Sequence, residues 1–326
     1  MKRVILGGDI GGTKTHLALF EKNEKRSWVV DAKYKSSDYE NLRSIVLGFL
    51  AKYSDYEIER ACFGIAGPVQ DGICKATNLP WIVDAAEVSE ATGIPSVSLI
   101  NDLEANAYGI SCLEEEEFFC LNEGKAKIGN AALIAAGTGL GEAGMFWDGE
   151  KIHPFACEGG HCGFAPENSL EIELLIYMFK KYDHVSFERV LSGPALYDLY
   201  RFLIDEGHEK ELDAVKKAFR ERPPPRVITE MGMNKSCPAC KRALGLFVSI
   251  YGNEAANLAL KILAVGGVYL GGGIAPKILG ALKEGDFMKR FVKKGRFSSL
   301  LLDIPVKVIL NENTAMLGAA YYARNR

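Results

Sequence analysis

The sequence contains no long apolar run and no excess of charge of either sign. No stretch approaches the roughly 20 apolar residues that a membrane-spanning helix requires, and the apolar run after Lys2 and Arg3 is too short for a secretory signal. The 39 basic and 42 acidic side chains leave a net charge of −3. A charge of this size does not by itself recruit nucleic acid or an anionic membrane. We therefore expect no nucleic-acid partner and no membrane partner.

Cysteine is sparse and irregularly spaced. Eight cysteines among 326 residues do not form the framework of a small disulfide-stabilised secreted domain. We expect reduced thiols and a cytoplasmic location. With 48% hydrophobic and 25% charged residues the chain has an ordinary globular composition, and its length suffices for two domains.

Short apolar runs alternate with stretches of helical periodicity along the chain, which is typical of an α/β protein. The first third reads as three strands, a helix, further strands and a helix that begins near Leu103. This order favours a mixed sheet over an all-parallel one. A helix-rich block follows, and its clearest loop is predicted at 220–226, where three prolines interrupt any helix. A strand at 305–310 and a helix from about Thr314 to Tyr322 close the chain.

Two glycine-rich turns each join a pair of apolar strands. "GGDIGGTKT" (7–15) lies between "VIL" and "HLALF", and "GTGLG" (137–141) lies within a second strand pair at 131–147. The first turn fails the Walker A pattern, because Thr13 separates Gly12 from Lys14 and a strand follows where a helix is required. A literal GxGxxG begins at Gly139, but it too continues as a strand, so no helix N-terminus faces a pyrophosphate.

Asp9 is unexpected in a turn suited to phosphate. Gly11 and Gly12 let the backbone approach an anion closely, and successive N–H groups can donate to phosphate together with the Thr13 hydroxyl. A carboxylate would repel that anion unless a cation lay between them. Because Mg²⁺ is usually held by one or two carboxylates, water and the nucleotide's own oxygens, Asp9 indicates a magnesium nucleotide. A plain hairpin in which Asp9 accepts from turn amides is the alternative.

Three motifs, in this order, resemble those of the sugar kinase, Hsp70 and actin superfamily. Its first phosphate motif is similar to Asp9-Ile10-Gly11-Gly12-Thr13, its second to "GTGLG", and its adenosine motif to "LGGGIAP" (270–276). Within the superfamily the chain resembles the bacterial glucokinases of the non-repressor type nearly end to end. Further stretches that carry this resemblance are "LINDLEANAYG" (99–109), "EGGHCGFAP" (158–166), "SFERVLSG" (186–193) and "NENTAMLGAA" (311–320).

The resemblance implies a two-lobed, actin-like ATPase (ribonuclease H-like) α/β fold with a ligand cleft between the lobes. It implies ATP and Mg²⁺ as cofactors, with the metal near Asp9 and held through water. The implied nucleotide-binding residues are Asp9, Gly11, Gly12, Thr13, Gly137, Thr138, Gly139, Gly272 and Gly273. We expect a small domain of 1–112 plus 304–326 and a large domain of 113–303. By the same analogy we expect a homodimer.

Asn101 and Asp102 end an apolar strand and open a helix, where both are strong N-cap residues. The resemblance favours a second role for Asp102, as the base that accepts the proton of the attacking sugar hydroxyl. Carboxylates, amides and neutral imidazole suit the paired donors and acceptors of a hexose. The glucose-binding residues that the resemblance implies are Asn101, Asp102, Glu158, His161 and Glu188. Taken alone, Glu188 is an ordinary helix residue and His161 is more often structural.

A structural zinc site is a weaker alternative. Cys157, His161 and Cys162 lie near one another in sequence, and "CPAC" adds Cys237 and Cys240. One CxxC pair without a second is half of the usual pattern, and Pro238 suits the first turn of a long helix. The related repressor-and-kinase proteins carry a denser cysteine zinc motif that is missing here.

The sequence thus predicts a glucokinase that transfers a phosphoryl group from ATP to the 6-hydroxyl of D-glucose, the first step of glycolysis. Three alternatives stay open: a kinase for mannose, fructose or an N-acetylhexosamine, a non-catalytic sugar sensor or DNA-binding regulator, and a chaperone-like or actin-like ATPase. The regulator is disfavoured because the chain starts at the phosphate hairpin, without room for an N-terminal helix-turn-helix. The ATPase would hydrolyse ATP without sugar and would not need Asp102 in a sugar pocket.

Overall fold

The structure, a computed structural model, describes residues 2–22, 26–125 and 127–326. These residues divide into two compact units, which we describe one at a time. Unit 1 comprises 1–117, 154–156 and 311–326, and unit 2 comprises 118–153 and 157–310. Within the described ranges, no helix combines the length and the apolar character needed to cross a membrane.

Unit 1 is built on a mixed sheet, as its apolar runs predicted. Its described residues form five strands in the order β3-β2-β1-β4-β8. These are β1 (Lys2–Ile10), β2 (Lys14–Glu21), β3 (Trp28–Lys35), β4 (Tyr56–Ile65) and β8 (Val97–Asn101). β1 pairs antiparallel with β2 and parallel with β4, and β4 pairs parallel with β8. The three parallel strands therefore end at one edge, where Asp9 is paired with Gly64 and Asn101 with Ile65.

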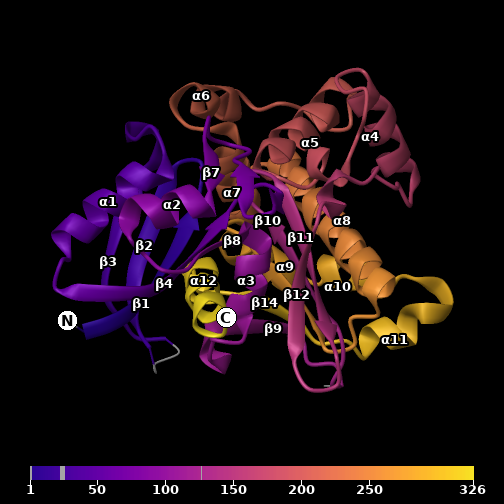
Figure 1. Ribbon diagram of the computed structural model, residues 1–326. Helices are drawn as coiled ribbons and strands as arrows, with labels where there is room; N and C mark the ends of the chain where they lie inside the picture. The colour runs from indigo at the N-terminus through magenta and orange to yellow at the C-terminus, as the bar shows by residue number, and fades with distance from the viewer. Residues whose placement is uncertain (1, 23–25, 126) are drawn as a thin grey trace. The chain divides into compact units, whose positions relative to one another are not determined.

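Helices cover both faces of this sheet because successive side chains of a strand point to opposite faces. Val4 and Leu6 of β1 belong to one buried cluster, with α1 and α2, whereas Ile5 belongs to another, with α3 and α12. In Figure 1 the yellow α12 lies beside α3, although about 200 residues of chain separate them. The helices are α1 (Leu42–Lys52), α2 (Ala85–Thr92), α3 (Asp102–Ile110) and α12 (Thr314–Arg324), with 3₁₀ turns η1 (Ser36–Asp38) and η2 (Glu115–Glu117). A small antiparallel sheet contains β5 (Val69–Gln70), β6 (Ile73–Lys75) and β7 (Ile82–Asp84).

Unit 2 is built on a second mixed sheet, whose described strands lie in the order β12-β11-β10-β13-β14-β9. Residues 154–156, in the middle of β12, are grouped with unit 1. These are β9 (Phe118–Asn122), β10 (Ala131–Ala136), β11 (Leu140–Trp147), β12 (Ile152–Cys157), β13 (Gly267–Gly271) and β14 (Val306–Ile309). β10 and β11 form an antiparallel hairpin around the second glycine turn, and β10 pairs parallel with β13. The second strand–turn–strand unit predicted from the sequence is therefore confirmed.

A helical layer packs on this sheet, and α8 is its longest member. Sixteen of the 25 residues of α8 are buried, and the Tyr251 hydroxyl donates to the Ile134 carbonyl of β10 over 3.1 Å. The helices are α4 (Ser169–Phe179), α5 (Gly193–Asp205), α6 (Asp213–Glu221), α7 (Pro224–Met233), α8 (Pro238–Ile262), α9 (Leu279–Lys283), α10 (Asp286–Val292) and α11 (Ser298–Leu302). The 3₁₀ turns are η3 (Gly159–His161), η4 (Phe187–Arg189), η5 (Ala275–Ile278) and η6 (Gly295–Phe297).

The predicted length of the loop at 220–226 is wrong. α6 ends at Glu221 and α7 already begins at Pro224, so only Arg222 and Pro223 separate the two helices. Proline is tolerated in the first turn of a helix, because the N–H that it lacks would have no partner there. The prolines thus start a helix as well as end one.

Candidate active site

The first glycine turn connects β1 to β2 in unit 1. It is closed by a bond from the Gly11 amide to the Lys14 carbonyl (3.0 Å), and the Ser36 hydroxyl donates to the Gly11 carbonyl (2.8 Å). A Cβ at Gly12 would lie 2.6 Å from the Cβ of Asn78, so a larger residue there would have to displace that side chain. Thr13 is exposed. The hydrogen bonds and the contact with Asn78 therefore restrain the backbone of the turn, and Thr13 stays accessible.

Two carboxylates meet at the edge of the same sheet. Asp9 lies near the end of β1, and Asp102 begins α3 directly after β8. Burial raises the pKa of the Asp9 carboxyl to about 6, and the charge of Asp102 acts in the same direction, while Lys14 opposes both. Because two negative charges repel each other, ionising both side chains without a cation nearby costs free energy.

The sequence does not decide whether Asn101 or Asp102 caps the helix. In the structure the two residues have different positions. Asn101 is the N-cap of α3: its side-chain oxygen accepts from the amides of Leu103 (2.8 Å) and Glu104 (3.3 Å), and its Nδ2 donates to the Gly67 carbonyl (3.2 Å). Asp102 is the first residue of the helix, with one oxygen 3.0 Å from the Leu103 amide. Since Asn101 already caps the helix, the carboxylate of Asp102 is not required for that purpose.

The second glycine turn, in unit 2, lies against Glu188. The Glu188 carboxylate accepts from the Leu140 amide (3.0 Å), and a Cβ at Gly139 would lie 2.4 Å from the same oxygen. The Gly193 amide at the start of α5 donates to the Gly137 carbonyl (2.8 Å). The structure thus joins Glu188, predicted to bind sugar, to the turn predicted to bind phosphate.

The third glycine motif packs on the same strand end. Gly272 has φ of +78°, and a Cβ there would lie 2.4 Å from the Ala136 carbonyl oxygen, so only glycine fits without strain. The Ile274 amide donates to that carbonyl over 3.2 Å. Gly273 is exposed. Two motifs that are far apart in sequence therefore meet where β10 and β13 end.

Glu158 and His161 belong to a tight turn around η3 in unit 2. The His161 amide donates to the Glu158 carbonyl (3.0 Å). The Glu158 side chain is 63% exposed and the His161 side chain 60%, and 3.9 Å separates the carboxylate from the imidazole. A Cβ at Gly160 would lie 2.1 Å from the Leu140 carbonyl oxygen, so the turn rests directly on β11. Both side chains are consequently presented on an exposed surface of this unit.

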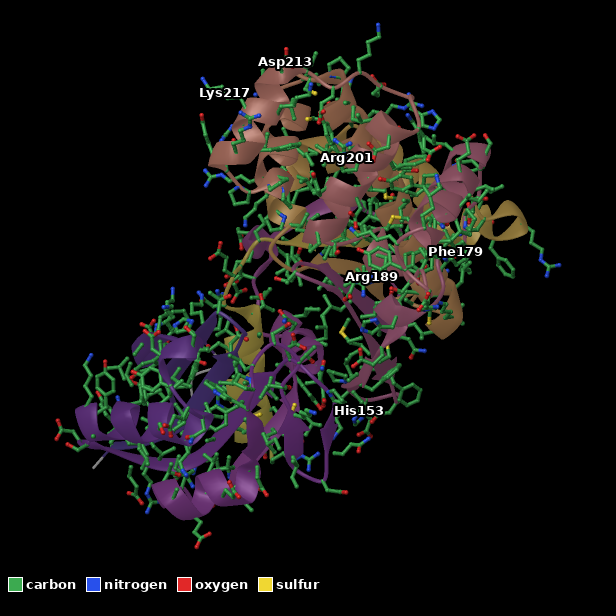
Figure 2. The ribbon with its side chains drawn as sticks, turned by 90° about the horizontal axis from the view of Figure 1, so that it is seen from above. His153, Phe179, Arg189, Arg201, Asp213 and Lys217 are labelled. Atoms are coloured by element: carbon green, nitrogen blue, oxygen red, sulfur yellow. The ribbon has the colours of Figure 1, made fainter. Side chains whose placement is uncertain are left out.

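Backbone and stacking contacts hold the Glu188 segment next to this turn. The Phe187 amide donates to the Cys162 carbonyl (2.9 Å), and Gly163 forms an antiparallel bridge with Ser186. Arg189, labelled in Figure 2, stacks 4.4 Å from the ring centre of Tyr182. Glu158, His161 and Glu188 therefore come from two segments that are joined by backbone contacts in the structure.

The zinc alternative finds no support in the arrangement of the thiols. Cys237 is the N-cap of α8, where its sulfur accepts from the Cys240 amide over 3.3 Å. Over the described ranges, no three His, Cys, Asp or Glu side chains are grouped to hold a metal ion, and the cysteines are free thiols. Cys237 therefore caps the start of α8.

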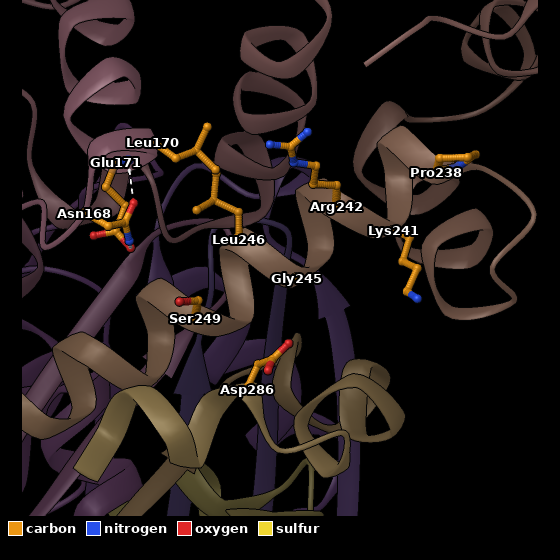
Figure 3. A pocket seen from close by; sticks show the side chains of 10 residues that line it. All are labelled: Asn168, Leu170, Glu171, Pro238, Lys241, Arg242, Gly245, Leu246, Ser249 and Asp286. Carbon is orange, nitrogen blue, oxygen red and sulfur yellow. Dashed lines mark hydrogen bonds between the residues drawn. The ribbon is translucent and has the colours of Figure 1, made fainter. Parts of the chain in front are cut away.

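A pocket of about 490 Å³ lies elsewhere in unit 2, beside α8 (Figure 3). It contains none of the residues predicted to bind ATP or sugar. One of its walls is the buried carboxylate of Glu171, which Asn168 contacts and which Arg290 binds through both oxygens at 2.9 and 3.1 Å. The lining residues are Asn168, Leu170, Glu171, Pro238, Lys241, Arg242, Gly245, Leu246, Ser249 and Asp286.

Known proteins match the chain over nearly its whole length. The family model named Glucokinase matches residues 6–326, and a glucokinase of Nostoc sp. is 40% identical over 98% of each chain. The chain belongs to the glucokinase family. A crystal structure of a glucokinase from an Antarctic psychrotroph is 31% identical, with a TM-score of 0.86 over 99% of each chain. The prediction of an ATP-dependent hexose kinase acting on glucose is thereby confirmed.

A more distant structure provides evidence for the fold alone. The ROK family glucokinase of Streptomyces griseus, solved with glucose and AMPPNP, is 20% identical, with a TM-score of 0.66 over 99% of this chain and 100% of that one. The α/β sugar-kinase fold is therefore common to both.

Sequence reasoning missed one feature of this enzyme. Glu142 of β11 and Glu254 of α8 are both buried, and Glu142 lies beneath the turn that carries Glu158 and His161. A signal was present, because a glutamate in the middle of the apolar run "GLGEAGMF" contradicts the pattern of a buried strand.

Proposed function

We propose that this enzyme transfers the γ-phosphoryl group of ATP to the 6-hydroxyl of D-glucose in a cleft between unit 1 and unit 2. The observation that carries this proposal is the interacting pair of carboxylates, Asp9 and Asp102, at the ends of β1 and β8, the two strands that flank β4. One lies beside the first glycine turn and the other opens α3. This arrangement supplies a cation-binding group and a proton acceptor at one edge of a sheet.

The residues present suit Mg²⁺. Burial and the charge of Asp102 make ionisation of the Asp9 carboxyl group unfavourable, and a nearby cation would offset this effect. Mg²⁺ needs only one or two protein carboxylates when water and phosphate oxygens complete its shell. When bound, it would neutralise charge on the transferring phosphates. We assign Asp9 to hold it through water.

We assign Asp102 as the general base. Phosphoryl transfer depends mainly on positioning and charge stabilisation, with an acidic residue accepting the proton of the nucleophile. Asp102 is held at the first position of α3 by the cap that Asn101 supplies. The carboxylate is therefore fixed in place by the helix start and remains a proton acceptor.

The other predicted residues divide between nucleotide and sugar. Gly11, Gly12, Thr13, Gly137, Thr138 and Gly139 would bind the phosphates, and Gly272 and Gly273 the adenosine. Glu158, His161, Glu188 and Asn101 would bind the glucose hydroxyls. Because Glu188 already contacts the Leu140 amide, its carboxylate would link the sugar subsite to the second phosphate turn.

We equate unit 1 with the small domain and unit 2 with the large one, with the later boundary at 311, because β14 pairs with β13 and β9. Closure of the lobes on glucose would exclude water and limit ATP hydrolysis. We also propose the non-repressor type, a homodimer and a cytoplasmic location.

A coupled assay of ADP release tests the substrate. We expect ADP release with Mg-ATP to depend on sugar, and kcat/KM to be highest for glucose in a panel with mannose, fructose and an N-acetylhexosamine. Glucose losing to another hexose by tenfold or more would overturn the substrate assignment. Steady ADP release without any sugar would instead indicate an ATPase.

Substituting Glu158→Gln tests the sugar-binding turn. Loss of a charged hydrogen bond costs about 1.5–3 kcal/mol, so we expect KM for glucose to rise about tenfold or more, while KM for ATP is unchanged. Glu150→Gln is the matched control, because Glu150 is an exposed glutamate in the same unit, on the β11–β12 connection. Equal KM values for the two variants would remove Glu158 from the site.

A further inference from the structure

A buried acidic pair lies beneath the Glu158–His161 turn. Glu142 is 1% exposed and Glu254 is 0% exposed. Acidic side chains are almost never fully buried unless they are paired. Neither glutamate has a role in the proposed reaction, so the burial of both in one place requires another explanation.

The partners of Glu254 account for one negative charge. Its carboxylate accepts from the Asn257 amide (2.8 Å) and from the Lys261 ammonium (3.2 Å). Lys261 therefore balances one of the two carboxylates. Glu142 lies close enough to Glu254 for their carboxyl groups to share a hydrogen bond, and such a bond needs a proton on one of them.

Glu142 is the better site for that proton. Burial, together with the charge of Glu254, raises the pKa of Glu142 to about 8, although Lys261 acts against this shift. Its Oε1 is buried and has no hydrogen-bond partner among the described residues. An oxygen without a donor is tolerable on a neutral carboxyl group but costly on a carboxylate.

The same side chain touches the turn above it. A Cβ at Gly159 would lie 1.9 Å from Oε2 of Glu142 and 2.8 Å from its carboxyl carbon, so the carboxyl group fills the space under this glycine. Gly159 is the first residue of η3 and directly follows Glu158. Any shift of Glu142 toward a new hydrogen-bond donor would therefore move the turn that presents Glu158 and His161.

We propose that Glu142 is a positioning residue for glucose: one proton shared with Glu254 keeps the Glu158–His161 turn in its binding shape, and loss of this proton weakens glucose binding without slowing phosphoryl transfer. This inference rests on the proposed role of the turn as the sugar subsite. It adds a pH-dependent determinant of glucose affinity that lies outside the sugar contacts.

Other titratable groups around Glu142 must be separated from it. Glu254, Lys261 and Tyr251 face it from α8, Cys157 from β12, and Glu158 and Cys162 lie on the turn itself. Burial raises the pKa of both the Cys157 thiol and the Tyr251 hydroxyl, so these two groups stay protonated around pH 8.

The test is the pH dependence of KM and kcat for glucose between pH 6.5 and 9. If only the protonated form binds, the competent fraction at pH 9 is about one-tenth, so KM of the unmodified enzyme should rise about tenfold above its value at pH 7. kcat should not follow this rise. Glu142→Gln keeps the shape and can donate to Glu254 without titrating, so its KM should stay flat.

Two variants serve as controls for the thiols. Cys157→Ser and Cys162→Ser remove the neighbouring thiols and should keep the alkaline rise in KM. Glu254→Gln gives a second route if Glu142→Gln does not fold, because its amide would donate to an ionised Glu142 and again make KM independent of pH.

The outcomes distinguish this inference from the proposed sugar site. An alkaline rise in Glu142→Gln, or in Glu254→Gln if that variant is used, equal to that of the unmodified enzyme would overturn the positioning role, as would a flat KM in the unmodified enzyme. If Glu158→Gln leaves KM unchanged at pH 7, the sugar subsite itself is misplaced. If Glu158→Gln raises KM but Glu142→Gln follows the unmodified profile, only the role of Glu142 fails.

Discussion

Asp102→Ala should lower kcat by at least about 10²-fold and leave glucose binding largely intact, because a general base acts in the transition state and contributes about 10²–10⁴-fold in rate. The helix should survive the change. Asn101 accepts from the same Leu103 amide that Asp102 contacts, so that donor keeps a partner. Single-turnover kinetics and glucose titration followed by protein fluorescence measure the two effects separately.

A control on the same helix isolates the chemistry. Glu104→Gln, two residues further along α3, should keep kcat within a factor of a few. Asp102→Asn keeps the size of the side chain but cannot accept the proton as a carboxylate, so it should be as slow as Asp102→Ala. Turnover of Asp102→Asn near that of the unmodified enzyme would remove the base assignment.

Gly318→Ala should destabilise unit 1 by about 3 kcal/mol, at the upper end of the usual cost of overpacking. A Cβ at Gly318 of α12 would lie 1.8 Å from the Ala105 carbonyl oxygen and 2.5 Å from the Gly109 amide of α3. Both atoms are helix backbone, which cannot rotate away as a side chain could. The two helices would have to separate, and α3 carries Asp102 at its start.

Urea unfolding measures this effect, and another helical glycine provides the control. Gly48 of α1 is exposed, and among the described residues nothing lies within 4 Å of the Cβ that alanine would add. Gly48→Ala should therefore stabilise the protein by up to about 1 kcal/mol through helix propensity alone. Similar midpoints for the two variants would show that α3 and α12 do not depend on the close approach.

The phosphate turns were accessible to sequence reasoning because they are local. A hairpin with glycines and a carboxylate can be recognised from nine consecutive residues, since turn geometry depends on the φ and ψ of those residues themselves. The same holds for the helix start at Asn101–Asp102. The sequence did not show which of the two residues caps the helix, however, and only the folded structure assigns the cap to Asn101.

The prolines at 223–225 show the limit of local rules. Proline both ends one helix and suits the first turn of the next, and the sequence does not say which effect dominates. α7 packs against α8 in the core of unit 2, with Val227 and Ile228 buried. Burial of these side chains favours continuing as a helix immediately after the break.

The family, the ATP-dependent reaction on glucose and the two glycine hairpins could be predicted without coordinates, because motif order and turn chemistry depend on short consecutive stretches of residues. Three relations are visible only in the folded chain: Asp102 raises the pKa of Asp9, Glu188 accepts from the Leu140 amide, and Glu142 lies under Gly159. These relations join residues from separate elements across sheets and helices. Their strength depends on distance and burial, which follow from packing and not from spacing along the chain.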